Sequence, residues 1–379
     1  MPTSGSPDIN LGGAVAAAIP DLERLREAAA GAPIYLVGGA VRDLLLGRER
    51  TDVDVVVEGD GAEVARRLGG EVTEHERFAT AKAQLGELQI DLASARAETY
   101  PQPGALPDVR PAGLDEDLAR RDFTINAMAV SLAGEPSLVD PHSGQADLDA
   151  GLLRVLHDGS FVDDPTRALR AARYAARFGF EPEPHTAGLL RQADLGTVSS
   201  DRAQAELLRV AAETEAPKGL GLIAEWELVK PRPDAAELLQ AVDELLNGPP
   251  WSEVVERPRA LIAAAFGSGG RESQLAELRP ARPSDAVEAA RGALPEELAL
   301  ARALGASWLD DYVSEGRSVA LEIGGGDLMA AGVPEGPAVG RGLAEALRRK
   351  LDGEISGRDE ELRAALEAAE EREGRDGVA

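Results

Sequence analysis

The chain has 379 residues and no cysteine, which excludes a disulfide framework, a thiolate zinc site and a cysteine nucleophile. Its 40 Lys and Arg against 67 Asp and Glu give a formal charge of −27, which argues against indiscriminate binding to nucleic acid or anionic lipid. Hydrophobic residues, at 44%, can bury a sizeable core, and the length favours two or more domains. No stretch of the sequence approaches about 18 uninterrupted apolar residues, and the N-terminal residues lack the pattern of a signal peptide. We therefore expect a cytoplasmic protein that does not bind a membrane.

The first part of the chain mixes strand and helix patterns. The apolar run at 34–37 predicts a strand, and the segment after Gly39 predicts a helix. Two further strand patterns follow at 52–57 and 88–93. These elements together indicate a small α/β domain. Residues 97–118 contain four prolines and several acidic residues, so we expect a surface loop there.

The second part of the chain is predicted to be helical. Beyond residue 140 strand patterns almost vanish, while Ala, Leu and Arg recur at helical spacing in four segments, about 164–178, 199–215, 235–246 and 255–266. No fixed repeat marks a solenoid. Residues 357–379, rich in Glu, Arg and Ala, predict an exposed helix that frays into a disordered end.

A glycine pair follows the first predicted strand. Gly38 and Gly39 open a helix that carries Arg42 in its first turn. Glycines let backbone N–H groups approach an anion, and an arginine can grip a phosphate through its planar fork. The pattern therefore indicates a phosphate seat, although taken alone such a turn is more often a packing feature.

Three carboxylates follow on predicted strands. Asp52 and Asp54 alternate with valines, so both point to one face, where they repel each other unless a divalent cation lies between them. Asp91 sits alone in a second apolar strand, where an unpaired carboxylate is costly. The alternative is a solvated edge strand. Combined with the glycine turn, however, these residues predict a two-metal site for phosphoryl transfer.

An arginine stripe marks the first helix of the second part. Arg167, Arg170 and Arg173 recur every three residues, and Asp164 precedes them on the same side. Such a stripe suits anions or base edges. The alternative is an ordinary solvated face with salt bridges.

These motifs, in this order, resemble the class II tRNA nucleotidyltransferase and poly(A) polymerase family. The resemblance rests on segments between residues 34 and 209, which are Gly38–Asp43, Asp52–Asp54, Arg120–Ala127, Asp140–Leu148, Asp163–Arg173 and Asp201–Leu207. It implies an α+β protein: a small α/β nucleotidyltransferase head of the polymerase-β type at 30–148, then an all-α neck at 149–215, body at 216–300 and tail at 301–379. It also implies addition of C, C and A to tRNA 3′ ends from CTP and ATP, with Mg²⁺ as cofactor.

The resemblance assigns roles to the motif residues. Asp52 and Asp54 would be catalytic and would hold the metal, and strand context adds Asp91 as a third catalytic acid. The nucleotide would be bound by Gly39, Arg42, Arg121, Asp164, Arg167, Arg170 and Arg173. Among these, Asp164 and Arg167 would pair with the Watson–Crick edge of C or A, whose donor and acceptor pattern G and U do not share. Arg170 and Arg173 would hold the triphosphate or the neck geometry.

Two questions stay open at this level. An enzyme that adds only CC or only A, or a poly(A) polymerase, would carry the same motifs. A catalytically silent RNA-binding protein would need damaged motifs, and these are intact. In the tail, glycine turns followed by Arg341 and by Arg348, Arg349 and Lys350 suit a grip on RNA backbone or an ordinary helical packing unit.

Overall fold

The computed structural model describes residues 10–48, 53–69, 71–73 and 80–370. The chain divides into two compact units, Met1–Leu228 and Val229–Ala379. The first is a sheet with helices and the second is helical, so the expected α+β class is confirmed. No helix among the described residues is long and apolar enough to cross a membrane.

The first unit is built on a mixed sheet of seven strands, in the order β3-β4-β5-β2-β1-β8-β9. Within it only β2 and β5 pair in parallel. The strands predicted at 34–37, 52–57 and 88–93 correspond to β1, β2 and β5. The strands are β1 (Ile34–Val37), β2 (Val53–Val57), β3 (Glu71–Thr73), β4 (Thr80–Leu85), β5 (Leu88–Ser94), β8 (Ala129–Ser131) and β9 (Ser137–Val139).

Alternation along the strands gives the sheet two different faces. Val53, Val55 and Val57 of β2 are buried in the main core. This core also contains residues of the head helices and of helix α8 (Thr166–Phe178). Val56 points the other way into a smaller core with Leu118 of α5, and Asp54 shares that second face. The head helices are α1 (Leu11–Ala18), α2 (Leu22–Ala29), α3 (Gly39–Leu45), α4 (Gly61–Arg67) and α5 (Leu114–Ala119).

The prediction of a surface loop at 97–118 is wrong. Strands β6 (Arg96–Thr99) and β7 (Asp108–Pro111) pair as an antiparallel ribbon, and helix α5 follows them. Three of the four prolines lie in the connection between the strands, at 101, 103 and 107, where no ladder hydrogen bond is lost. The prolines therefore mark the turn of a hairpin.

The remaining elements of the first unit surround α8, the helix predicted at 164–178. Its small buried side chains, such as Ala172 and Ala176, allow α10 and α11 to pack against it. These elements are η1 (Thr124–Asn126), α6 (Gly144–Ala150), β10 (Leu152–Leu153), α7 (Ser160–Asp163), α8 (Thr166–Phe178), β11 (Glu181–Pro182), α9 (Pro184–Leu190), η2 (Leu195–Thr197), α10 (Ser200–Ala211) and α11 (Ala216–Glu225).

The second unit contains only helices among its described residues. The helices predicted at 235–246 and 255–266 are α12 and α13. The full set is α12 (Ala235–Leu245), η3 (Trp251–Glu253), α13 (Arg257–Phe266), α14 (Arg271–Glu277), α15 (Pro283–Ala290), α16 (Pro295–Ala303), α17 (Leu309–Ser314), η4 (Gly316–Ser318), α18 (Gly325–Ala330), α19 (Pro337–Leu351) and α20 (Arg358–Glu370).

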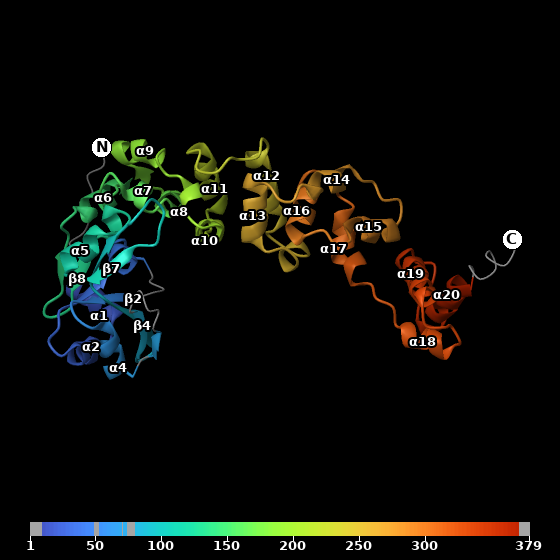
Figure 1. The fold of residues 1–379 in the computed structure, drawn as a ribbon, viewed down its shortest axis with the longest axis horizontal. Coiled ribbons are helices and arrows are strands. Elements are labelled where there is room, and N and C mark those ends of the chain that lie inside the picture. The colour runs from blue at the N-terminus through green and yellow to red at the C-terminus, as the bar shows by residue number, and fades with distance from the viewer. Residues whose placement is uncertain (1–9, 49–52, 70, 74–79, 371–379) are drawn as a thin grey trace. The chain divides into compact units, whose positions relative to one another are not determined.

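The helix expected to be exposed at the C-terminal end is partly buried. Helix α20 packs beside α19 (Figure 1), and Gly342 of α19 lies so close to it that a Cβ would overlap the carbonyl oxygen of Ala365. Ala364, Ala365 and even Glu361 are buried in this contact. The small side chains that suggested an exposed helix are those that permit the close approach. Residues 371–379 lie outside the described part.

Candidate active site

Three charged side chains form a row across the second face of the sheet. Asp54 on β2 and Asp91 on β5 are Cα partners in the parallel ladder, and Lys82 on β4 is the partner of Asp91. Paired positions on neighbouring strands point to the same face. The Nζ of Lys82 is 3.8 Å from Oδ1 of Asp91. The register thus brings together two of the predicted catalytic carboxylates, while Asp52 lies outside the described residues.

The carboxylate row borders a cavity of about 420 Å³. Its lining combines two acids with four cations. These charged residues are Asp54, Lys82, Asp91, Arg96, Arg120 and Arg121. Carboxylates beside guanidinium groups suit a polyphosphate bound together with divalent cations.

The turn after β1 passes close to Arg121. Gly38 has φ 65° and ψ −131°, a backbone conformation that residues other than glycine rarely adopt. A Cβ on Gly38 would lie 2.6 Å from Nη1 of Arg121. Gly39 is the first residue of α3. The first glycine therefore leaves space for a guanidinium group on the wall of the cavity.

Asp117 on α5 fixes two of the arginines that line the cavity. It is fully buried, and its Oδ1 accepts from Nη2 of Arg120 at 2.7 Å while its Oδ2 accepts from Nη2 of Arg121 at 2.8 Å. Burial alone would raise the pKa of Asp117, but the two guanidinium groups hold it below its ordinary value. Among the described residues, the buried Nε of Arg121 has no hydrogen-bond partner. Arg121 is thus held by Asp117 while its Nε donor is unused.

Arg42 lies in a different network, which joins the head to α8. Its Nη1 donates to Oδ1 of Asn126 at 2.7 Å, and its Cζ is 4.6 Å from the ring centroid of Phe178. The Nδ2 of Asn126 donates to Oδ1 of Asp122 at 2.9 Å, and Oδ2 of Asp122 accepts from Nε of Arg170 at 2.8 Å. The structure connects Arg42 with Arg170, and neither lines the cavity that holds the carboxylate row.

The ion pair between Asp122 and Arg170 joins a buried carboxylate to a partly buried guanidinium group. Burial raises the pKa of Asp122, but Arg170 and the amide of Asn126 bring it down to about 2. Burial would lower the pKa of Arg170, yet the carboxylate of Asp122 raises it. Arg173 lies one turn further along α8, with Nη2 3.4 Å from the hydroxyl of Tyr174. Arg170 is therefore held against the head by an ion pair with Asp122.

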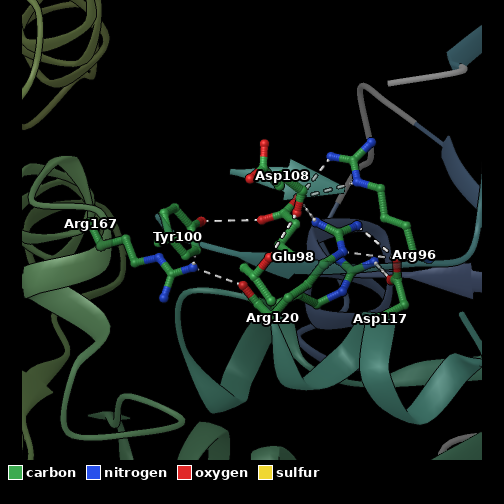
Figure 2. Close-up of polar contacts among 9 residues, drawn as sticks. Arg96, Glu98, Tyr100, Asp108, Asp117, Arg120 and Arg167 are labelled. Atoms are coloured by element: carbon green, nitrogen blue, oxygen red, sulfur yellow. Dashed lines mark hydrogen bonds and ion pairs between the residues drawn. The ribbon is translucent and has the colours of Figure 1, made fainter. Parts of the chain in front are cut away.

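Arg167 faces the connection between β6 and β7, as Figure 2 shows. Its side chain is buried, and its Nη1 donates to Oγ of Ser160 at 2.8 Å. Its Nη2 donates to the carbonyl oxygen of Arg120 at 2.8 Å and to the hydroxyl of Tyr100 at 3.3 Å. Three of the five N–H donors of the guanidinium are thus used within the protein. The remaining donors could meet a base edge.

Asp164 lies just before α8 and is held by two residues. Its Oδ1 accepts from the hydroxyl of Thr166 at 2.6 Å and from Nη2 of Arg202 at 3.0 Å. Asp164 and Arg167 therefore lie at the same end of α8. A second cavity, of about 560 Å³, is lined by Arg167 and by Arg120, which also lines the first cavity.

The donors in the first cavity fit a divalent metal. Asp54 and Asp91 supply carboxylate oxygens at adjacent positions of two strands, and hard oxygen ligands suit Mg²⁺. Within the described residues there is no group of three or more acidic or histidine side chains arranged as a metal site. Asp52, two residues before Asp54, is the remaining acid of the motif and lies outside those residues.

Sequence reasoning missed several residues around the site. Arg96, Glu98 and Tyr100 alternate along β6 and its end, so they share a face, but the expectation of a loop hid this period-two pattern. Asp117 sits in an acidic stretch that also suggested a loop. Lys82 carries no motif, and only the register of β4 against β5 places it beside Asp91.

The basic cluster of the tail is paired within the protein. Nη2 of Arg348 is 2.8 Å from Glu345, Nε of Arg349 is 2.9 Å from the same carboxylate, and Nζ of Lys350 is 2.5 Å from Glu361. Hydrogen bonds from Arg348 and Arg349 lower the pKa of Glu345 to about 2. An RNA phosphate would have to compete with these carboxylates.

Comparisons with known proteins agree with this geometry. Residues 34–154 match the Poly A polymerase head domain family. The chain is 35% identical to an A-adding tRNA nucleotidyltransferase of Geobacter sulfurreducens over 89% of its own length, but it spans only 45% of that relative. It is 36% identical to a CC-adding tRNA nucleotidyltransferase of Deinococcus radiodurans, covering 90% of this chain and 91% of that relative.

Solved structures of similar proteins cover nearly the whole chain. The Thermotoga maritima CCA-adding enzyme complexed with tRNA is 30% identical, with a TM-score of 0.69, and the match covers 92% of this chain and 95% of that one. A CCA-adding enzyme complexed with CTP is 28% identical, with a TM-score of 0.73 and 95% of each chain covered. From its motifs, its fold and these matches, the chain belongs to the tRNA nucleotidyltransferase and poly(A) polymerase family.

Proposed function

We propose that this protein adds C, C and A to the 3′ end of tRNA from CTP and ATP, without a nucleic-acid template. The observation that carries the proposal is the pairing of Asp54 with Asp91 across β2 and β5, in a cavity that also contains arginines. The relatives and solved neighbours are named for the same type of reaction.

In the proposed reaction the 3′ hydroxyl oxygen of the RNA attacks the α-phosphorus of the nucleotide. A new phosphodiester bond forms, the bond to pyrophosphate breaks, and the hydroxyl proton passes to solvent. Arg121, held by Asp117 with its Nε unused, would bind the triphosphate, and Arg120 would add positive charge beside it. Fixed cations of this kind stabilise the charge that gathers on the leaving pyrophosphate.

Mg²⁺ would be held by Asp52 and Asp54, with Asp91 as a third acid beside them. When bound, the ion would lower the pKa of the attacking hydroxyl and neutralise the polyphosphate. The neighbouring Lys82 pairs with Asp91 and so offsets part of the negative charge of the row.

Asp164 and Arg167 would select the base. Asp164 would accept a hydrogen bond from the exocyclic amino group that C and A share, and Arg167 would donate to a ring nitrogen or carbonyl oxygen. Gly39 and Arg42 remain proposed nucleotide contacts of the first helix. Arg170 and Arg173 have contacts that suit the second predicted role, support of the neck.

A specific observation favours one alternative. One relative, 36% identical and matched along 91% of its own length, is a CC-adding enzyme, so addition of C and C without A is the second candidate. Addition of A alone, or poly(A) synthesis, would use the same carboxylates.

We also propose the domain boundaries given above, with a nucleotidyltransferase head at 30–148, a neck at 149–215, a body at 216–300 and an RNA-binding tail at 301–379. A protein with these substrates would work in the cytoplasm.

One assay separates the candidates. Purified protein is given tRNA transcripts that end before CCA, after C or after CC, with each nucleotide supplied singly. If the protein adds the full CCA end, C is incorporated on the first two transcripts and A on the third. C without A would establish the CC-adding alternative, A on the third transcript alone would establish the A-adding one, and failure with all three would contradict the proposal.

A further inference from the structure

The connection between β6 and β7 contacts Arg167 directly and reaches Asp164 through Arg202. On one side, the hydroxyl of Tyr100 accepts from Nη2 of Arg167 at 3.3 Å, and Cζ of Arg167 is 5.8 Å from the centroid of the Tyr100 ring. On the other side, the carbonyl oxygen of Gly104 accepts from Nη1 of Arg202 at 2.8 Å, while Nη2 of Arg202 holds Asp164. One short segment of the head is therefore linked to both Arg167 and Asp164, the two residues proposed to read the base.

The hydroxyl of Tyr100 has a defined direction. It donates to Oε2 of Glu98 at 3.1 Å, so its oxygen lone pairs are left for Arg167. Burial raises the pKa of Tyr100 to about 12, with Arg167 opposing and Glu98 adding to the shift. The phenol is therefore protonated throughout the neutral range, and its donor and acceptor roles are fixed.

Glu98 is itself held by the arginines of the first cavity. Its Oε1 accepts from Nη1 of Arg120 at 2.9 Å and from Nη2 of Arg96 at 3.1 Å, and only 8% of its side chain is exposed. Figure 2 shows the resulting chain of contacts from Arg96 and Arg120 through Glu98 to Tyr100 and Arg167. Within this series of contacts, the side chain of Tyr100 is the one that touches Arg167.

The segment cannot shift easily against the neck. Gly104 has φ 69°, and a Cβ there would overlap the hydroxyl and backbone of Thr197. Its N–H donates to the carbonyl oxygens of Val162 and Asp163, each at 3.2 Å. The position of Tyr100 is thus set by close backbone contacts four residues away.

We propose that Tyr100 is a positioning residue for base selection: its hydroxyl and ring hold the guanidinium group of Arg167 in the orientation that distinguishes C from U. This inference rests on the proposed function. It assigns to Tyr100 an effect on discrimination that operates through Arg167 and not through contact with the substrate.

The test compares Tyr100→Phe with Tyr35→Phe in the full chain. Each variant loses one hydroxyl that contacts a glutamate, since the hydroxyl of Tyr35 lies 3.4 Å from Oε2 of Glu58. The ratio of kcat/KM for CTP to that for UTP is measured on tRNA lacking its CCA end. Tyr100→Phe should lower this ratio about three- to tenfold, the usual net effect of one intramolecular hydrogen bond. Tyr35→Phe should leave it unchanged.

A double variant shows whether Tyr100 acts through Arg167. In an Arg167→Ala background, Tyr100→Phe should cause no further loss of discrimination, because the group it orients is gone. An unchanged ratio in the single variant, or an undiminished effect in the double variant, would overturn the inference while wild-type activity upholds the proposed function. A wild-type chain that adds no nucleotide would contradict both.

Discussion

Replacing Gly38 by Ala tests whether the turn after β1 exists to admit Arg121. The first cost is conformational, because φ 65° with ψ −131° is strained for any L-residue, at roughly 1–3 kcal/mol. The second is steric: the new Cβ would lie 2.6 Å from Nη1 of Arg121, so the guanidinium must move by about 1 Å to reach ordinary contact. Together we expect the free energy of unfolding to fall by about 2–3 kcal/mol.

Gly47→Ala is the matched control for this change. Gly47 has nearly the same φ, 64°, but a Cβ there would meet nothing within 4 Å. For a unit of this size, about 2–3 kcal/mol lowers the unfolding temperature of the first unit by about 4–12 °C, measurable by calorimetry on the full chain. Nucleotide addition should fall at least about tenfold in Gly38→Ala and stay unchanged in Gly47→Ala, because only the first displaces a proposed triphosphate contact.

Two results would contradict this explanation of the Gly38→Ala effect. If Gly38→Ala and Gly47→Ala lose the same stability and neither loses turnover, the close approach to Arg121 has no energetic or catalytic importance. If adding Arg121→Ala to Gly38→Ala recovers none of the lost stability, the cost is not steric. Recovery of stability without recovery of turnover is the expected result.

Replacing Asp54 or Asp91 by Asn should lower the single-turnover rate at least about 100-fold while tRNA affinity in filter binding is unchanged; an equal loss of affinity would contradict the metal assignment. Arg167→Ala should raise UTP incorporation relative to CTP about five- to a hundredfold, and equal slowing with both nucleotides would show that Arg167 does not read the base. Asp122→Asn should cost about 3 kcal/mol by breaking the buried pair with Arg170. Because the pKa of Asp122 falls from 3.8 to about 2 on folding, this difference should be complete above about pH 4 and shrink toward about pH 2 in urea unfolding; a constant difference would exclude the ion pair as its source.

The sequence was sufficient for the elements with strong local patterns. The run of valines predicted β2 and its buried face, and the spacing of Ala, Leu and Arg predicted α8 within two residues. The hairpin of β6 and β7 was missed because prolines in its connection outweighed four-residue strands. Pairing between the two strands, which a reading of each segment alone does not show, supplies the missing information in this case.

The site was predictable in its residue types and less so in its contacts. The motifs named Asp54 and Arg121, strand context named Asp91, and the register and the cavity bring these three together. Helical spacing grouped Arg167 with Arg170, yet the two make contacts in separate networks because each turn of α8 meets a different part of the head. Spacing along a helix gives a shared face, but the surface opposite decides what each residue does.

The parallel register of β2 and β5 determines where natural insertions and deletions can occur. Asp54 and Asp91 meet because both strands are anchored by buried residues, not because the intervening chain has a given length. Residues 58–87 could therefore lengthen or shorten at their turns while the two acids stay opposite each other. Loss of a single residue inside 53–57 would turn the acid toward the core and a valine toward the cavity. Homologues should therefore vary in length in the first interval and never in the second.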